Sequence, residues 1–199
     1  MKKQKEKGLS LKTQFKEAWS YIKESRGYIF IAVALFILSS IVGAVFQEAF
    51  APMINEILKN LIDKTSGLNT PEMIFFILQN NAQSAFLSIF FGMIFGIFPI
   101  ISTVTNGVVV GYVLVKATEI AGISSWWRIL PHGIFELPAI FISFGLGIKL
   151  GFTLFLKREA RTKEFKKRFY NSMNTILMII IPLLIIAAII EGVLIGFLE

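Results

Sequence analysis

The sequence predicts an all-α, polytopic helical membrane protein with five transmembrane helices. Of its 199 residues, 55% are apolar, and the mean hydropathy is +0.70. Several stretches reach the roughly 20 apolar residues that a helix needs to cross a bilayer. A soluble domain of this length has too little interior to hide so much apolar surface. The lipid bilayer is therefore the first expected partner, with a multi-pass location in the cell membrane.

Basic residues are concentrated in two blocks. Eight of the 20 Lys and Arg residues lie in residues 1–26, and seven more lie in residues 157–168. Blocks of this kind beside membrane spans are typical of cytoplasmic anchors at an anionic leaflet. No aromatic–basic motif accompanies them, so the net charge of +7 does not indicate nucleic acid as a partner.

Residues 1–26 are predicted to form a basic cytoplasmic segment, and residues 27–199 one membrane domain. The basic segment contains an amphipathic helix at residues 9–26, which either lies in the membrane interface or packs on a cytoplasmic loop of the protein itself. The pattern favours neither arrangement. The apolar side of this helix carries Leu11, Phe15, Ala18, Trp19 and Ile22.

The first apolar run is longer than the core of a signal peptide, so we expect it to be retained as a span. With the N-terminus in the cytoplasm, five spans place both basic blocks on the cytoplasmic side and the C-terminus outside. The spans are predicted at about residues 27–47, 84–102, 104–121, 133–156 and 173–198.

The segments between the spans follow from polar and turn-forming residues. Residues 48–72 are predicted to form an outer loop that ends in a helix start, with Thr70 as N-cap. A polar patch at residues 79–84 marks the approach to the second span. Residues 102–106 are predicted to form a turn, and residues 157–168 a basic loop.

Glycine pairs with GxxxG spacing occur in four of the predicted spans. Two glycines four residues apart let helix backbones approach closely, which is how apolar helices associate in lipid. We expect most pairs to pack within the chain, with one face left for a partner or for a homodimer. The pairs are Gly92/Gly96, Gly107/Gly111, Gly147/Gly151 and Gly192/Gly196.

The fourth span begins with two prolines, Pro131 and Pro138, which bracket Gly133. Proline removes a backbone donor and can kink a helix. The spacing therefore suggests a broken or re-entrant beginning of this span, and ordinary bundle geometry is the alternative.

Ionisable residues inside a membrane cost roughly 2.5–3.5 kcal/mol each on insertion scales, so they are expected to have partners. Lys149, toward the inner end of its span, can snorkel to the interface. In the predicted topology the other ionisable residues of the spans gather near the outer end of the bundle. This polar intramembrane cluster consists of Lys116, Glu119, His132, Glu136 and Glu191.

The predicted cluster allows four interpretations. It forms a satisfied network that only holds the bundle together, or a polar cavity that accepts an ion, a proton or a small polar group. The third interpretation is a contact surface for a partner span or an extracytoplasmic protein, and the fourth is a metal site. One His and no Cys make a poor transition-metal site. We therefore expect neither a metal nor a cofactor.

Catalysis is not expected from this sequence. It contains no HExxH motif, no P-loop and no recognisable nucleophile turn. The protein is therefore predicted not to be an enzyme.

A spaced set of residues runs through the predicted spans. Its most specific part is Pro131-His132-Gly133 followed by Glu136 and Pro138. The other members are Asn81, Gly92, Gly96, Asn106, Gly107, Gly111, Ala139, Gly145, Gly147 and Gly151. In these positions the chain resembles the stage II sporulation protein M family, over about residues 25–198.

The resemblance implies a polytopic membrane protein without known catalytic residues. The best-known members act during engulfment in sporulating bacteria, where they anchor a complex with extracytoplasmic peptidoglycan-degrading partners; relatives occur in archaea. We therefore expect a non-enzymatic scaffold that anchors or positions other membrane or extracytoplasmic proteins at the cell envelope. The alternative is a subunit of a transporter or channel with a polar intramembrane site around Glu119, His132 and Glu136.

Overall fold

A computed structural model describes residues 10–198, with the backbone alone for residues 127–132, 197 and 198. Residues 10–198 contain helices and no strand. A π-helix at Ile176–Ile180 separates the last two α-helices. The α-helices are α1 (Leu11–Glu24), α2 (Arg26–Val45), α3 (Gln47–Thr65), α4 (Thr70–Gly92), α5 (Ile97–Ala121), α6 (Trp126–Gly151), α7 (Arg158–Thr175) and α8 (Ile181–Leu198).

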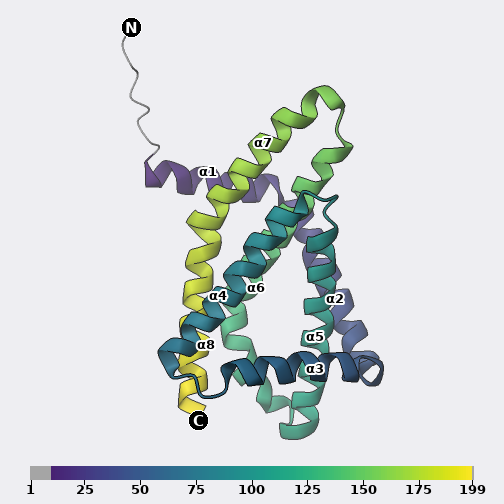
Figure 1. Cartoon of the computed structure of the whole chain (residues 1–199), viewed down its shortest axis with the longest axis vertical. Coiled ribbons are helices and arrows are strands. Elements are labelled where there is room, and N and C mark those ends of the chain that lie inside the picture. The colour runs from purple at the N-terminus through teal and green to yellow at the C-terminus, as the bar shows by residue number, and fades with distance from the viewer. Residues whose placement is uncertain (1–9, 199) are drawn as a thin grey trace.

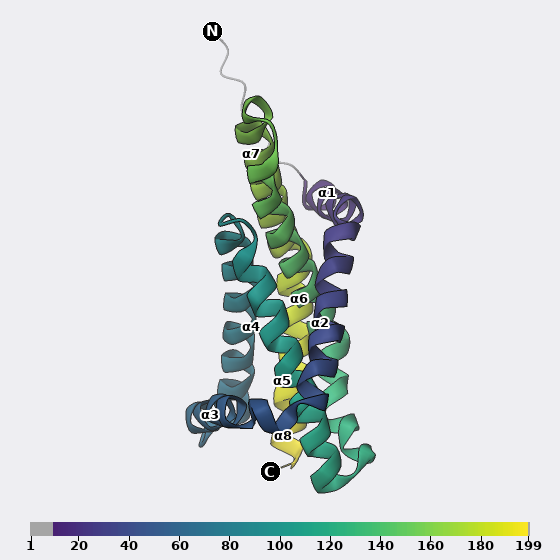
Figure 2. The ribbon, with the colours of Figure 1, turned by 90° about the vertical axis from the view of Figure 1, so that its right-hand side faces the viewer.

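Five helices in the described chain are long and apolar enough to cross a membrane, which equals the number of spans that the sequence predicts. They are α2, α4, α5, α6 and the long rod that α7 and α8 form together (Figure 1). Helices α1 and α3 lie across opposite ends of this bundle, which we call the α1 end and the α3 end (Figures 1 and 2). The C-terminus lies at the α3 end.

The second and third spans differ from the predicted boundaries. The second span begins at Thr70, where Asn69 and Glu72 form a capping box, so Asn69 and not Thr70 is the N-cap. The polar patch at residues 79–84 lies inside α4 and does not precede it. The predicted loop at residues 48–72 contains a further helix, α3.

The turn between these spans is at residues 93–96 and not at residues 102–106. The polar side chains of the predicted turn bond to the preceding helical turn, because the Thr103 hydroxyl donates to the Pro99 carbonyl at 2.6 Å and the Asn106 amide donates to the Ser102 carbonyl at 2.7 Å. The helix therefore continues through them. The chain reverses at Gly96 instead, whose φ of +69° favours glycine.

Residues 157–168, predicted as a loop, belong mostly to helix α7. Helix α7 extends beyond α1 and continues into α8 through the π-helix (Figure 1). The π-helix ends two residues before Pro182, and a wider turn accommodates a ring that cannot donate to the helix. Helix α6 runs without interruption from Trp126 to Gly151, so the fourth span has no broken beginning.

Glycines bring the helices into backbone contact. A Cβ at Gly147 in α6 would lie 2.5 Å from the Ser88 carbonyl oxygen of α4, and a Cβ at Gly151 would meet the backbone of Gly92 and Gly96. Elsewhere, Gly111 of α5 lies against the backbone of α2 in the same way. The GxxxG glycines thus have close neighbours within the chain, and these contacts hold α4 against α6 and α2 against α5.

Helix α1 forms as predicted and packs on α7 and the π-helix. Ala18 and Tyr21 are buried on this side. The Asn174 side chain donates a hydrogen bond of 2.9 Å to the Gln14 carbonyl and joins the two segments. One side of α1 therefore packs on the protein itself, whereas Leu11, Phe15 and Trp19 remain exposed.

Candidate functional site

A polar cavity of about 580 Å³ lies between α4, α5, α6 and α8, on the side of α3 that faces the bundle. Two of its three asparagines, Asn81 and Asn106, belong to the spaced set that the sequence singled out. Leu61, Ile62 and Thr65 of α3 line its outer side. The polar side chains that line it from the other helices are Asn80, Asn81, Asn106, Glu136 and Glu191.

These polar side chains come from positions well inside their helices. Asn81 follows the first residue of α4 by eleven positions, Asn106 that of α5 by nine, and Glu136 that of α6 by ten. At 1.5 Å per residue, these positions are about 14–17 Å from the helix ends. Three helices thus place an amide or a carboxylate two to three turns from their first residues, whereas Glu191 lies seven positions before the last residue of α8. No Lys, Arg or His is among the described residues that line the cavity.

Two further members of the predicted cluster, Lys116 and Glu119, lie on α5. The Lys116 ammonium donates to the Glu119 carboxylate at 2.9 Å, and the Glu48 carboxylate is 3.8 Å away. Gln47 at the start of α3 also donates to Glu119, at 3.1 Å. This group fastens α3 to α5 at an exposed edge, and the partial exposure of Lys116 lowers the energetic contribution of its ion pairs.

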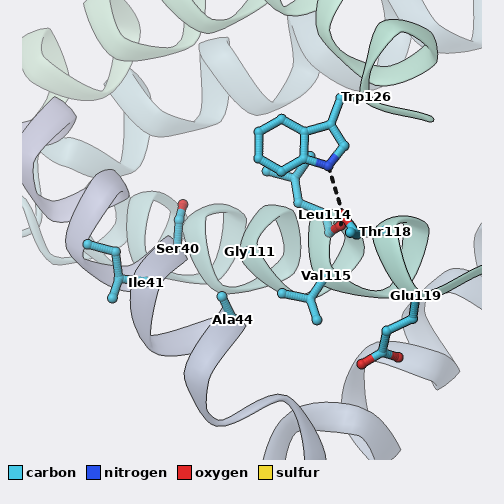
Figure 3. Close-up of a pocket in the computed structure, with 9 residues that line it drawn as sticks. All are labelled: Ser40, Ile41, Ala44, Gly111, Leu114, Val115, Thr118, Glu119 and Trp126. Atoms are coloured by element: carbon cyan, nitrogen blue, oxygen red, sulfur yellow. Dashed lines mark hydrogen bonds between the residues drawn. The ribbon is translucent and has the colours of Figure 1, made fainter. Parts of the chain in front are cut away.

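An apolar groove of about 420 Å³ lies beside this ion pair (Figure 3). Small residues of α2 and α5 form part of it, and the Trp126 ring covers one side, where the indole donates a hydrogen bond of 2.9 Å to the Thr118 hydroxyl. The lining residues are Ser40, Ile41, Ala44, Gly111, Leu114, Val115, Thr118, Glu119 and Trp126.

The predicted polar cluster is therefore distributed over two places. Glu136 and Glu191 line the polar cavity, whereas Lys116 and Glu119 form the ion pair beside the apolar groove. His132 and Pro131 lie outside the residues whose side chains the structure describes. Asn81 and Asn106, which the sequence indicated only through the family resemblance, share the polar cavity with both glutamates.

A third polar group, which the sequence did not indicate, lies at the α1 end. The Lys149 side chain is 4% exposed, and its ammonium donates hydrogen bonds of 2.9 Å to both the Glu24 carboxylate and the Ser25 hydroxyl. It also lies 4.0 Å from the centre of the Tyr21 ring, a favourable position for a cation over an aromatic face. The Arg168 guanidinium donates to the Lys149 carbonyl at 2.7 Å. These contacts join α1, the Ser25 junction before α2, α6 and α7.

Two ionisable groups of α1 respond to this network. The hydrogen bond from Lys149 lowers the pKa of the Glu24 carboxyl below its ordinary value of 4.5. Burial raises the pKa of Tyr21 to about 12, because the phenolate loses its hydration. The charge of Lys149 was visible in the sequence, but its partner Glu24 is 125 positions away and carries no local signal.

No group of three or more His, Cys, Asp or Glu side chains that could hold a metal ion occurs among the described residues. The oxygen atoms of the polar cavity can accept hydrogen bonds from water or from a protonated ligand, or bind a hard cation.

Comparison with known proteins identifies the family. The family model of stage II sporulation protein M matches residues 32–194, a range that includes the apolar groove and every residue that lines the polar cavity except Ile195. An uncharacterized protein of the archaeon Methanocaldococcus jannaschii is 31% identical over 172 residues, which cover 82% of this chain and 90% of that protein. No solved structure matches the chain. The chain belongs to the stage II sporulation protein M family.

Proposed function

We propose that this protein is a non-enzymatic scaffold of the cell membrane, which positions a partner by binding one of its transmembrane helices. The observation that carries the proposal is the apolar groove between α2 and α5 (Figure 3). The groove is formed by two helices that are long and apolar enough to span a membrane. Family membership supports the proposal, since the best-known members anchor a membrane complex.

The chemistry of the groove suits a helix. Ser40 and Ala44 are four residues apart on α2, beside the contact of α2 with Gly111 of α5, and their small side chains leave room for a second helix to approach closely in lipid. The Ser40 hydroxyl donates to the Phe36 carbonyl at 2.8 Å, so its polar group is satisfied without a partner. Around the groove, Ile41 is 54% exposed and offers apolar contact area.

Site-specific photo-crosslinking in native membranes tests this proposal. A photoreactive benzoylphenylalanine replaces Ala44 in the groove, and a control replaces Phe75, which is exposed on α4. We expect one membrane protein to crosslink at position 44 and not at position 75. Filling the groove with Ala44→Leu should release this partner in mild detergent while the scaffold remains folded.

Three outcomes of this crosslinking experiment would contradict the proposed binding of a partner helix. Crosslinks to lipid alone at position 44 would rule out a protein in the groove. Crosslinks between two copies of this chain would replace the proposed partner with a homodimer. A partner that is retained in full by Ala44→Leu would place the contact on another surface.

A second function is favoured by the polar cavity. Asn81, Asn106, Glu136 and Glu191 bring amide and carboxylate oxygens from four helices to one cavity, and such oxygens suit a hard cation or a proton. This is the arrangement expected for a transporter or channel subunit that binds a cation or a proton.

Reconstituted liposomes separate this function from the scaffold. We expect cation or proton flux that is lost in Glu136→Gln and in Glu191→Gln, but kept in Glu56→Gln, which changes an exposed carboxylate of α3. Flux that is absent from the native protein, or unchanged in both cavity variants, would contradict the transport function and leave the scaffold proposal intact.

A further inference from the structure

We propose that α1 is a membrane-surface helix that binds anionic lipid headgroups through a row of lysines. The inference concerns the α1 end of the molecule and is independent of the apolar groove. It rests on the rotation of α1 about its own axis, which contacts within the protein determine.

One side of α1 packs on the rest of the protein. Ala18 is 1% exposed and Tyr21 3% exposed, and both face α7 and the π-helix. The Asn174 amide donates to the Gln14 carbonyl, and Lys149 bonds to Glu24 at the end of the helix. With contacts near both ends, α1 has one fixed rotation.

The neighbouring side of α1 is apolar and exposed. Leu11, Phe15 and Trp19 recur every four residues and form one stripe. They are 72%, 52% and 49% exposed, so the protein itself leaves this stripe uncovered. A stripe of Leu, Phe and Trp beside a basic one is the composition of helices that lie in a membrane interface.

A row of lysines borders this apolar stripe. At 100° per residue, Lys12, Lys16 and Lys23 lie next to the apolar stripe, on the side away from α7. The Lys23 ammonium lies 5.9 Å from the centre of the Trp19 ring, so cation and aromatic side chain are neighbours. Glu17 lies farther round the helix, on the remaining side. Ammonium groups at the edge of an apolar stripe lie at headgroup depth when the stripe enters the lipid.

Helix α1 lies at the point where the first span begins. Helix α1 ends at Glu24, and the first span begins at Arg26, so α1 leads directly into α2. It lies across the long axis of the bundle and is seen nearly end-on after a turn of 90° (Figures 1 and 2). This places it at the level where the spans begin. The three lysines make anionic lipid, rather than an apolar protein face, the matching occupant of this surface.

The chain has no cysteine, so a single fluorophore can be attached at any chosen position. We place one at Phe15→Cys, on the apolar stripe, and a control at Phe75→Cys, which is exposed on α4 toward the α3 end. The protein is reconstituted in phosphatidylcholine vesicles that contain brominated phosphatidylglycerol or, at the same mole fraction, brominated phosphatidylcholine. Bromine quenches a fluorophore only on contact, so the ratio of the two quenching constants reports lipid preference.

At position 15 we expect quenching by both lipids and a preference of several-fold for phosphatidylglycerol at low salt. A lysine near an anionic surface contributes about fivefold, and high salt should bring the ratio toward one. The variant Lys12→Gln/Lys16→Gln/Lys23→Gln should also bring it toward one, without loss of quenching by phosphatidylcholine. The ratio at position 75 should be close to one.

Three results would overturn the inference. An absence of quenching at position 15 would show that the apolar stripe is not in lipid. A ratio of one in the unmodified lysine background would show that headgroup charge is not recognised. A ratio that persists in the triple variant would assign recognition to residues other than these lysines.

Discussion

The Lys149 ammonium in α6 lies 2.9 Å from the Glu24 carboxylate at the end of α1. The two side chains differ in their surroundings, since that of Lys149 is 4% exposed and that of Glu24 is 55% exposed. A buried cation inside a membrane bundle thus reaches out to an anion at the surface. The pair fastens α1 to helix α6 of the bundle.

The asymmetry of this pair predicts unequal effects of its two neutralising variants. In Glu24→Gln the buried ammonium loses its counter-charge, which we expect to cost roughly 1–3 kcal/mol of stability, less than a fully buried pair because Glu24 is half exposed. In Lys149→Met the carboxylate turns to water and the cost should be smaller, about 1 kcal/mol. Thermal unfolding in detergent measures both. An equal or reversed order would contradict the assignment of Lys149 as the costly partner.

The same pair predicts a dependence on acid. Because the hydrogen bond from Lys149 lowers the pKa of Glu24, the unfolded chain takes up this proton at a higher pH than the folded one. The contribution of Glu24 is therefore complete above its ordinary pKa of 4.5 and is lost as the pH falls through the folded-state value. The difference in Tm between the native protein and Glu24→Gln, measured from about pH 7 to about pH 3, should shrink toward zero. A constant difference would argue against the ion pair.

Close backbone contact between α4 and α6 predicts intolerance of a single methyl group. In Gly147→Ala the new Cβ would overlap the Ser88 carbonyl oxygen, and the helices would separate at a cost of about 1–3 kcal/mol. Gly27 offers a matched control, since a Cβ there meets no atom within 4 Å. Gly27→Ala should be neutral or stabilising by up to about 1 kcal/mol, because alanine favours the helix. Similar unfolding temperatures for both variants would refute the close packing.

The start of α4 predicts a helix-capping effect. Asn69 accepts a hydrogen bond of 3.0 Å from the Glu72 backbone, and the Glu72 side chain accepts one of 2.9 Å from the Asn69 backbone. Asn69→Ala should therefore cost about 1 kcal/mol in an unfolding experiment. Ser10 is the comparison, because it stands at the N-cap of α1 without a capping side-chain bond. Ser10→Ala should leave stability unchanged, and an equal loss in both would exclude the capping box as the cause.

Part of this architecture was accessible from the sequence because hydropathy is a local, additive property. A run such as residues 27–47 indicates a span whatever lies around it, and the actual helix α2 differs from this range by one or two residues at each end. The amphipathic helix near the N-terminus was accessible for the same reason. The number of spans follows from such runs alone.

Local rules were insufficient where polar residues occur inside a span. The amides near Asn81 indicated the approach to a helix, yet in the structure they line the polar cavity within α4. Thr103 and Asn106 indicated a turn, yet both bond to carbonyls of their own helix. A polar side chain that another helix or its own backbone satisfies does not end a helix, and only the packed structure shows that it is satisfied.

The sequence by itself determined that the chain is helical, that five segments are apolar enough to cross a bilayer, and which polar residues those segments carry. The tertiary structure decided which of these residues meet: Glu136 and Glu191 share one cavity, while Lys149 reaches Glu24. The physical reason is that helix formation depends on neighbours within a few positions, whereas side-chain partners depend on how helices pack. The spacing of the glycines indicated that helices would approach closely, but only the packed structure shows which helices meet at them.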